Sequence, residues 1–170
     1  NMIPGVVFTW STDVGVVNST GYFTAQTMPG SGSVTAMFGS VNGSAVIAIL
    51  VGLIDHIIIN PDPVSIAVGG SQQFTAAAYD VYNNSIPGAE FTWSTNVGVV
   101  NSTGYFTAQT MPMTGWINAV NDTATGVAAI NVILGPLDHI IVNPNPLTIV
   151  VGESQQFSAT AYDVYNNLIP

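Results

Sequence analysis

The sequence of 170 residues contains no lysine, no arginine and no cysteine, against nine acidic side chains and two histidines. Its formal net charge at pH 7 is −9. A chain without cationic side chains cannot neutralise phosphates, so nucleic-acid partners and attraction to anionic lipid are excluded. Lysine Schiff bases and arginine-assisted phosphoryl transfer are excluded for the same reason. The lack of cysteine removes disulfides, zinc–thiolate sites and cysteine nucleophiles.

Long hydrophobic runs are also lacking, although 48% of the residues are hydrophobic and therefore indicate a folded chain. The longest apolar run, residues 45–54, has about half the length that a membrane-spanning helix needs. Because it is rich in β-branched residues, we expect a buried strand and no membrane insertion. The opening sequence NMIPGVVF has no basic region and no cleavage site, so we expect that any secretory signal has been removed.

The main feature of the sequence is a repeat. Three blocks recur at one constant offset, and no gap is needed anywhere. The longest block, FTWSTDVGVVNSTGYFTAQTMP, is repeated with one change, from Asp13 to Asn96. The chain thus holds two copies of an 83-residue repeat plus four more residues, and these last four match residues 1–4 in position. The paired blocks are residues 8–29 with 91–112, 55–63 with 138–146, and 71–84 with 154–167.

Each period consists of short β-type segments with turn signals about every ten residues. Apolar and polar residues alternate with a period of two, and no stretch keeps a helical period. We therefore predict an all-β chain of tandem two-sheet β-sandwiches. The expected strands in one period cover residues 55–60, 64–68, 73–79, 90–94, 97–100, 104–108, 116–120 and 127–134.

The order of the motifs, from DHI and NP through SQQF and AYDVYNN to FTWST and NSTGYFTA, resembles the Ig-like modules of prokaryotic surface proteins. It is similar to the tandem domains of intimin/invasin-type adhesins and to archaeal S-layer and surface-protein repeats. The resemblance covers the whole chain and implies an Ig-like fold and a structural role, without catalytic residues. The residues that carry it are Gly69, Phe74, Ala78, Asp80, Asn84, Pro87, Phe91, Trp93, Ser94, Gly98, Gly104 and Phe106, with their copies.

The two ends of the chain do not coincide with the boundaries of the expected modules. Residues 54–136 form one complete Ig-like module, residues 1–53 hold the C-terminal strands of a module whose first strands are missing, and residues 137–170 hold the N-terminal strands of the next. Such a half-module exposes an unpaired edge and an open core. Two explanations fit: residues 137–170 of one subunit complete residues 1–53 of the next by donor strand complementation, or the chain is a window on a continuous tandem array.

Asparagine-based glycosylation sequons are the strongest candidates for modification. Two of them form one repeated turn beside Gly21 and Gly104, where a glycan can project and hydrate a surface that has few charges. We expect a glycoprotein, with bare polar turns as the alternative. The sequons begin at Asn18, Asn42, Asn83, Asn101 and Asn121.

Metal sites are not expected. His56 and His139 follow Asp55 and Asp138, and strand alternation places such neighbours on opposite faces, so a linker hydrogen bond is the simpler interpretation. The oxygen-rich turns are weak Ca²⁺ candidates, because Asp and Asn also form turns by bonding to their own backbone. The calcium candidates are Asp80, Asn83, Asp163 and Asn166.

Aromatic residues are interpreted mainly as core. Trp10 and Trp93 lie on an expected central strand, and Phe74 and Phe157 begin another, so all four are core candidates rather than a sugar-binding platform. Trp116 has no copy in the other repeat, and a role in contacting a partner or glycan is left open for it. No serine–histidine–aspartate set and no carboxylate pair is credible, so we expect no enzyme.

As a whole, the sequence predicts an extracellular, prokaryotic and preferably archaeal structural protein at the cell surface. Its Ig-like modules join head to tail with further copies of themselves into a filament, stalk or surface layer. The alternative is an adhesin or phage-type Ig-like binding module that recognises glycans or a cell surface. No cofactor is expected apart from the weak calcium candidates.

Overall fold

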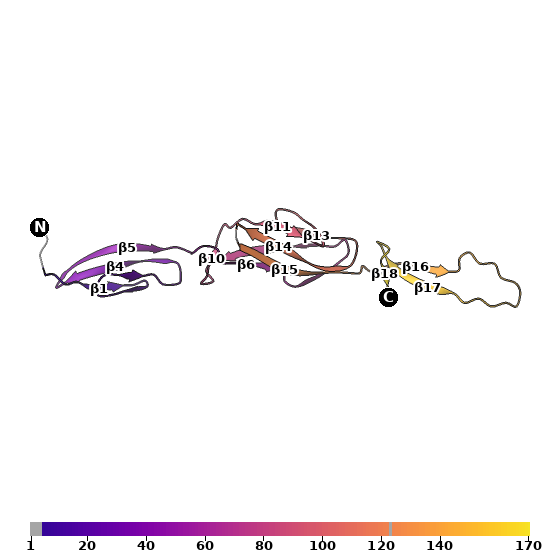
Figure 1. Ribbon diagram of the computed structural model, residues 1–170, viewed down its shortest axis with the longest axis horizontal. Helices are drawn as coiled ribbons and strands as arrows, with labels where there is room; N and C mark the ends of the chain where they lie inside the picture. The colour runs from indigo at the N-terminus through magenta and orange to yellow at the C-terminus, as the bar shows by residue number, and fades with distance from the viewer. Residues whose placement is uncertain (1–4, 123) are drawn as a thin grey trace. The chain divides into compact units, whose positions relative to one another are not determined.

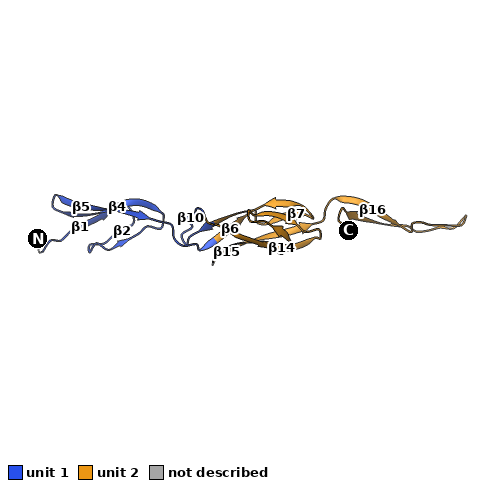
Figure 2. Ribbon diagram, turned by 90° about the horizontal axis from the view of Figure 1, so that it is seen from above, with its two compact units in different colours: residues 1–56, 78–88 blue, residues 57–77, 89–170 orange. Residues whose placement is uncertain are grey.

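The computed structural model describes residues 5–122 and 124–170, and it consists of strands and connecting loops (Figure 1). The expected all-β class is confirmed. No helix that is long and apolar enough to cross a membrane occurs in these residues. Residue contacts divide the chain into two units, residues up to 56 together with 78–88, and residues 57–77 together with 89–170 (Figure 2). The predicted module boundaries near residues 54 and 137 stay predictions, and we use them to name an N-terminal segment (5–53), a middle segment (54–136) and a C-terminal segment (137–170).

The N-terminal segment forms two small antiparallel sheets. One has the order β1-β4-β5, and the long hairpin of β4 and β5 is its centre, with Gly30 opposite Ile49 and Phe38 opposite Val41. The other pairs β2 with β3. In the described residues, no strand pairs with the outer edge of β5. The strands are β1 (Thr9–Thr12), β2 (Val16–Val17), β3 (Phe23–Thr24), β4 (Gly30–Phe38) and β5 (Val41–Ile49).

The middle segment repeats these strands and adds partners to both sheets. Its larger sheet has the order β11-β14-β15-β7, in which β7 runs parallel to β15. A second sheet has the order β12-β13-β8, and a third has the order β10-β9-β6. The strands are β6 (His56–Asn60), β7 (Val64–Ala67), β8 (Ser71–Gln73), β9 (Thr75–Tyr79), β10 (Ser85–Ile86), β11 (Thr92–Thr95), β12 (Gly98–Val100), β13 (Tyr105–Ala108), β14 (Met113–Asn121) and β15 (Ala124–Ile133).

The C-terminal segment forms one antiparallel sheet of order β16-β17-β18. Its strands are β16 (Leu137–Asn143), β17 (Ser158–Asp163) and β18 (Leu168–Ile169). Residues 147–150 and 154–156, whose copies in the middle segment are β7 and β8, are not in strands here and are exposed to solvent. The same sequence pattern is therefore strand in one copy and loop in the other.

The expected strands of the middle segment are present with differences in their bounds, and β10 is an additional strand outside the expected ranges. The segment 73–79 is interrupted at Phe74, which separates β8 from β9. Strands β14 and β15 begin three residues before the predicted starts at 116 and 127, because Gly115 and Gly126 do not break them. A Cβ at Gly126 would lie 2.7 Å from the carbonyl oxygen of Ile57, so glycine at this position lets β6 approach β15 closely.

The core lies in the middle segment. Phe74 and Phe106 are fully buried and pack edge to face, with their ring centroids 6.0 Å apart. Alternate residues of β15 are buried, as the two-residue period of a strand requires. Further fully buried side chains are Val97, Ile117, Ile130 and Val132.

The prediction that residues 45–54 form a buried strand is wrong for this structure. Strand β5 ends at Ile49, and Val46, Leu50 and Leu53 are strongly exposed. The physical reason is the free edge of β5: a strand is buried only where other strands or a second sheet cover it.

Candidate functional site

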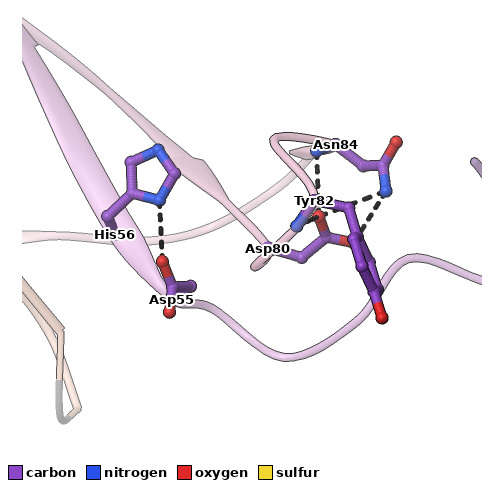
Figure 3. A network of polar contacts seen from close by, with 5 residues as sticks. All are labelled: Asp55, His56, Asp80, Tyr82 and Asn84. Carbon is purple, nitrogen blue, oxygen red and sulfur yellow. Dashed lines mark hydrogen bonds and ion pairs between the residues drawn. The ribbon is translucent and has the colours of Figure 1, made fainter. Parts of the chain in front are cut away.

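The turn of residues 80–84 contains a buried carboxylate, and both of its oxygen atoms accept hydrogen bonds. Oδ1 of Asp80 accepts hydrogen bonds from the backbone N–H groups of Tyr82 and Asn84, each at 2.9 Å. Its Oδ2 accepts the backbone N–H of Gly52 at 3.0 Å. The side-chain amide of Asn84 donates to both carboxylate oxygens and to the carbonyl of Thr27, the last at 2.7 Å. Figure 3 shows Asp80 facing Asn84 and Tyr82 across this turn.

We name these four residues, Asp80, Asn84, Gly52 and Thr27, the first clasp, because they tie the last residues of the N-terminal segment to a turn of the middle segment. Gly52 follows β5, and Thr27 follows β3. The shared carboxylate and the amide of Asn84 hold both of these residues at once, so the clasp fixes the course of the chain where the first segment ends.

The same arrangement is built a second time, one repeat further along. Oδ2 of Asp163 accepts the backbone N–H of Gly135 at 3.1 Å, and the side-chain amide of Asn167 donates to the carbonyl of Thr110 at 2.8 Å. The backbone N–H groups of Tyr165 and Asn167 again donate to Oδ1. This second clasp, formed by Asp163, Asn167, Gly135 and Thr110, shows that the junction is a regular part of the repeat.

Hydrogen bonds lower the pKa of both clasp carboxyls. The side-chain amide of Asn84 is the main cause that lowers the pKa of Asp80 to about 2, against the opposing effect of burial. Burial by itself would raise the pKa of Asp163, but the hydrogen bonds from Asn167, Gly135 and Tyr165 outweigh it and lower that pKa. Both groups are therefore carboxylates at neutral pH.

A second polar pair stands at each junction. Nδ1 of His56 lies 3.0 Å from Oδ2 of Asp55, and the imidazole stacks on the ring of Tyr79 with centroids 5.4 Å apart. His139 repeats both contacts with Asp138 and Tyr162. The expected linker hydrogen bond is thus seen in both copies. Asp55 precedes β6, which begins at His56, and Asp138 lies where the register of β16 shifts between Leu137 and His139, so regular strand alternation does not govern either pair.

The calcium candidates Asp80, Asn83, Asp163 and Asn166 lie in the clasp turns. Asn83 and Asn166 have φ near +60°, the left-handed turn conformation that asparagine tolerates. Protein donors already occupy the carboxylate oxygens of Asp80 and Asp163, so a cation would compete with them. Among the residues that the structure describes, no group of three or more His, Cys, Asp or Glu gathers.

The free edge of β5 is the other candidate site. In the middle segment the equivalent edge of β15 is covered by β7, and the N–H of Val68 continues the pairing by donating to the carbonyl of Ile133 at 2.9 Å. Beside the edge of β5 lies a cavity of about 490 Å³, lined by Ala25, Gln26, Ile49 and Leu50 of the N-terminal segment and by Tyr82 of the middle segment, among others. A second cavity, of about 730 Å³, is lined by Phe8, Phe38 and Val41 among others. Both cavities are lined mainly by apolar side chains.

The five sequons occupy different environments. Asn18 and Asn101 are exposed, and their Oδ1 atoms accept hydrogen bonds from Thr20 and Thr103, while no described residue bonds to their amide nitrogens. Asn42 lies within β5 opposite Met37, and Asn83 lies in the first clasp turn. The amide of Asn121 donates to the carbonyl of Glu90, and the threonine of its sequon, Thr123, lies outside the described residues.

The aromatic candidates are distributed unevenly. Phe74 is fully buried, whereas Phe157, its copy, is 47% exposed because no second sheet covers it in the described residues. Trp10 and Trp93 are half-buried. The indoles of Trp10 and Trp93 lie against Gly21 and Gly104, where φ is near +80° and a side chain would collide with the ring. Trp116 on β14 is 36% exposed.

Sequence reasoning missed Gly52, Thr27, Gly135 and Thr110 as clasp members. Each contributes only a backbone group to the clasp, and backbone groups leave no signal in the identity of a residue. The available signal was the repeated Asp-x-x-x-Asn spacing of Asp80 with Asn84 and of Asp163 with Asn167.

Comparisons with known proteins identify the fold. FdeC, described as an adhesin of Escherichia coli, aligns with a TM-score of 0.53 and 16% identity over 84% of this chain and 53% of that chain. The fold is Ig-like. Domains 4–9 of the surface layer protein SbsC align with a TM-score of 0.44 and 18% identity, over 99% of this Ig-like chain and 30% of that chain. InvD of Yersinia pseudotuberculosis aligns with a TM-score of 0.47 and 19% identity, over 99% of this chain and 63% of that chain. The Ig-like chain thus spans less than two thirds of each of these structures. No family model and no curated protein matches.

Proposed function

We propose that this chain is an extracellular structural repeat protein whose Ig-like modules join head to tail in a filament, stalk or surface layer. The observation that carries the proposal is the clasp, which is built twice from the same four positions of the repeat. A junction that repeats with the module gives every module an equivalent neighbour, which is what a linear array requires.

The half-open N-terminal segment supports the same proposal. An uncovered β5 edge and apolar hollows call for strands that complete the module. Those strands come either from another subunit, by donor strand complementation, or from a preceding stretch of the same polypeptide. Both sources produce the same head-to-tail series of modules.

A cell-surface location is part of the proposal. The absence of lysine and arginine removes the cleavage sites of trypsin-like proteases, and glycans at Asn18 and Asn101 would hydrate a surface that has few charges. FdeC is an adhesin, and we extend a surface role to this chain as a proposal. The proposed role is non-enzymatic.

Two measurements on the native protein test this function. Antibody against the middle segment should label intact, unpermeabilised cells, and electron microscopy should place the label along filaments, stalks or a layer. Label found only after permeabilisation would refute the proposal. The intact mass of the dissociated subunit then separates the two sources of strands: a mass near 17.7 kDa plus glycans indicates subunits that complete one another, and a several-fold larger mass indicates a continuous array.

A binding role is the second candidate, and Trp116 is the observation that favours it. Its indole is exposed on β14, and the repeat gives it no copy, because Ser33 stands at the equivalent position. Exposed tryptophan is enriched where proteins contact partners and sugars. Glycan-array binding that is lost in W116A and retained in N101Q would support an adhesin.

A further inference from the structure

The free edge of β5 lacks the strand that covers the equivalent edge of β15. Resting on the proposed function, we propose that residues 147–156 of a second copy of this chain dock there in a single register. Leu147 to Val150 of the second copy run parallel to Ile47–Leu50, and Ser154 to Gln156 of the second copy run antiparallel to Tyr22–Thr24. The middle segment supplies the template, since it contains the same strands with their partners in place.

The first half of the register comes from β15 and β7. In the middle segment Ile130 lies opposite Val64 and Ile133 lies opposite Ala67, in a parallel pair. One repeat away, the equivalent pairs are Ile47 with Leu147, and Leu50 with Val150. The pairing continues past the strand, because the N–H of Val68 donates to the carbonyl of Ile133. The equivalent interchain bond joins the N–H of Val151 to the carbonyl of Leu50.

The second half of the register comes from β13 and β8. Thr107 lies opposite Ser71 in an antiparallel pair, with 3.2 Å between their hydroxyl oxygens. The equivalent residues are Thr24 of one copy and Ser154 of the other. Sequence identity in the donor is complete here, because residues 154–157 repeat the SQQF of residues 71–74.

The exposed fractions of the side chains show which face of the donor lacks a covering partner. Ile58 and Ile141, which point away from the core, are 45% and 43% exposed in the two copies. Ile57 is 7% exposed, but its copy Ile140 is 57% exposed. Phe157 and Val151 are likewise exposed, whereas their copies Phe74 and Val68 are buried. The uncovered residues are thus those that the docked position would bury.

The acceptor has matching space. Ile57 lies against Gly126 in the middle segment, whereas nothing lies within 4 Å of a Cβ at Gly43, the equivalent glycine. The hydroxyl group of Tyr165 contacts Gly69, and the equivalent Tyr82 lines the 490 Å³ cavity beside β5. Docking would therefore place Ile140 of the second copy on Gly43, and Gly152 of the second copy on Tyr82.

The donor turn is already formed before docking. Glu153 replaces Gly70 in this turn, yet its N–H keeps the hydrogen bond to the carbonyl of Val150 at 3.1 Å, as that of Gly70 does to Ala67 at 2.9 Å. Gly152 has a φ of +91° and Gly69 one of +70°, so both turns use the left-handed region that glycine adopts freely. The substitution changes a side chain and leaves the backbone that would pair unaltered.

Cysteine cross-linking tests the register without interference, because the chain has no cysteine of its own. Single variants T24C and S154C of the full chain are purified apart, mixed and oxidised. We expect a disulfide-linked dimer of twice the chain mass from the mixture, reversed by reductant, and none from either variant alone. The double variant T24C/S154C should give a ladder of multimers.

Three controls make the result decisive. The variant S71C/T107C should close an internal disulfide and form no disulfide between chains, which shows that this pair geometry allows the bond. T107C mixed with S154C should not cross-link, because Ser71 already faces Thr107. In the mixture of T24C and Q156C, the two cysteines lie two residues out of the proposed register, so they should cross-link far less.

The outcomes separate this inference from the proposed function. No dimer from T24C and S154C, with S71C/T107C closing normally, overturns docking by a second copy, while surface labelling of a several-fold larger subunit would keep the array. Equal cross-linking by Q156C overturns the register. A dimer in register, found in a protein that antibody locates inside the cell, would keep the docking and refute the surface function.

Discussion

The N-terminal and middle segments share one nearly identical block, residues 8–29 and 91–112, but differ in the strands that cover it. Val16 and Val99, which face outward, are both 69% exposed. Ala108 is buried, whereas its copy Ala25 is exposed, because β13 has β8 on its second edge and β3 has a strand, β2, on one edge only among the described residues. The comparison shows that local sequence forms the hairpins in both places, while most of the buried core forms in the middle segment, where further strands pair with them.

The largest expected effect separates Phe74 from Phe157. F74A removes a fully buried ring and should lower the free energy of unfolding of the middle segment by about 3–5 kcal/mol. F157A removes an exposed ring and should change the stability of the unassembled chain by no more than about 0.5 kcal/mol. Urea unfolding, followed by hydrogen exchange in β14 and β15, measures both. Equal losses would mean that Phe157 is already packed in the single chain.

A matched glycine pair gives the next effect. G126V forces a side chain into Ile57 and should destabilise the middle segment by about 1–3 kcal/mol. G43V meets nothing within 4 Å, so the single chain should fold as before, yet the valine occupies the space that Ile140 of a second copy needs. Sedimentation should therefore show that G43V chains fail to assemble. Normal assembly of G43V would contradict the proposed docking.

The clasps should make the free energy of unfolding decrease at low pH. A carboxyl whose pKa falls from 3.8 to about 2 on folding stabilises the fold above pH 3.8, and this contribution disappears as the pH falls toward 2. The variant D80N/D163N should be less stable than the parent at pH 7, and the difference should shrink between pH 4 and pH 2. Thermal unfolding of both proteins across that range measures it. A constant difference would indicate that the carboxylate charge has no role.

The histidine pairs should give the smallest effect, and the same one in both places. His56 and His139 make equivalent contacts with partly exposed partners. Exposed pairs of this kind contribute little, so H56A and H139A should each change the free energy of unfolding by about 0.5 kcal/mol or less. Urea titration of the two variants side by side checks this. A large or unequal loss would show that the two junctions differ in a way that their geometry does not reveal.

Much of the fold could be predicted because its signals are local. Period-two alternation gave the strands of the middle segment, and the repeat predicted that each turn would occur twice. The expected strands 116–120 and 127–134 begin just after Gly115 and Gly126, whereas β14 and β15 include both glycines. The residues that a Cβ at these glycines would meet, Val97 and Ile57, are distant in sequence. The sequence predicts the clasp residues only as a turn and a weak calcium candidate, since the partners Gly52 and Thr27 contribute backbone groups alone.

By itself, the sequence determined the all-β class, the length of the repeat and the faces of the strands, because alternation and turn chemistry act between near neighbours. The tertiary structure decided which copies of an apolar residue are buried, as Ile57 and Ile140 show. It also decided that Asp80 and Asp163 bond to backbone far along the chain rather than stand as free carboxylates. Burial and buried hydrogen bonds need partners that are distant in sequence, and only the folded chain brings those partners together.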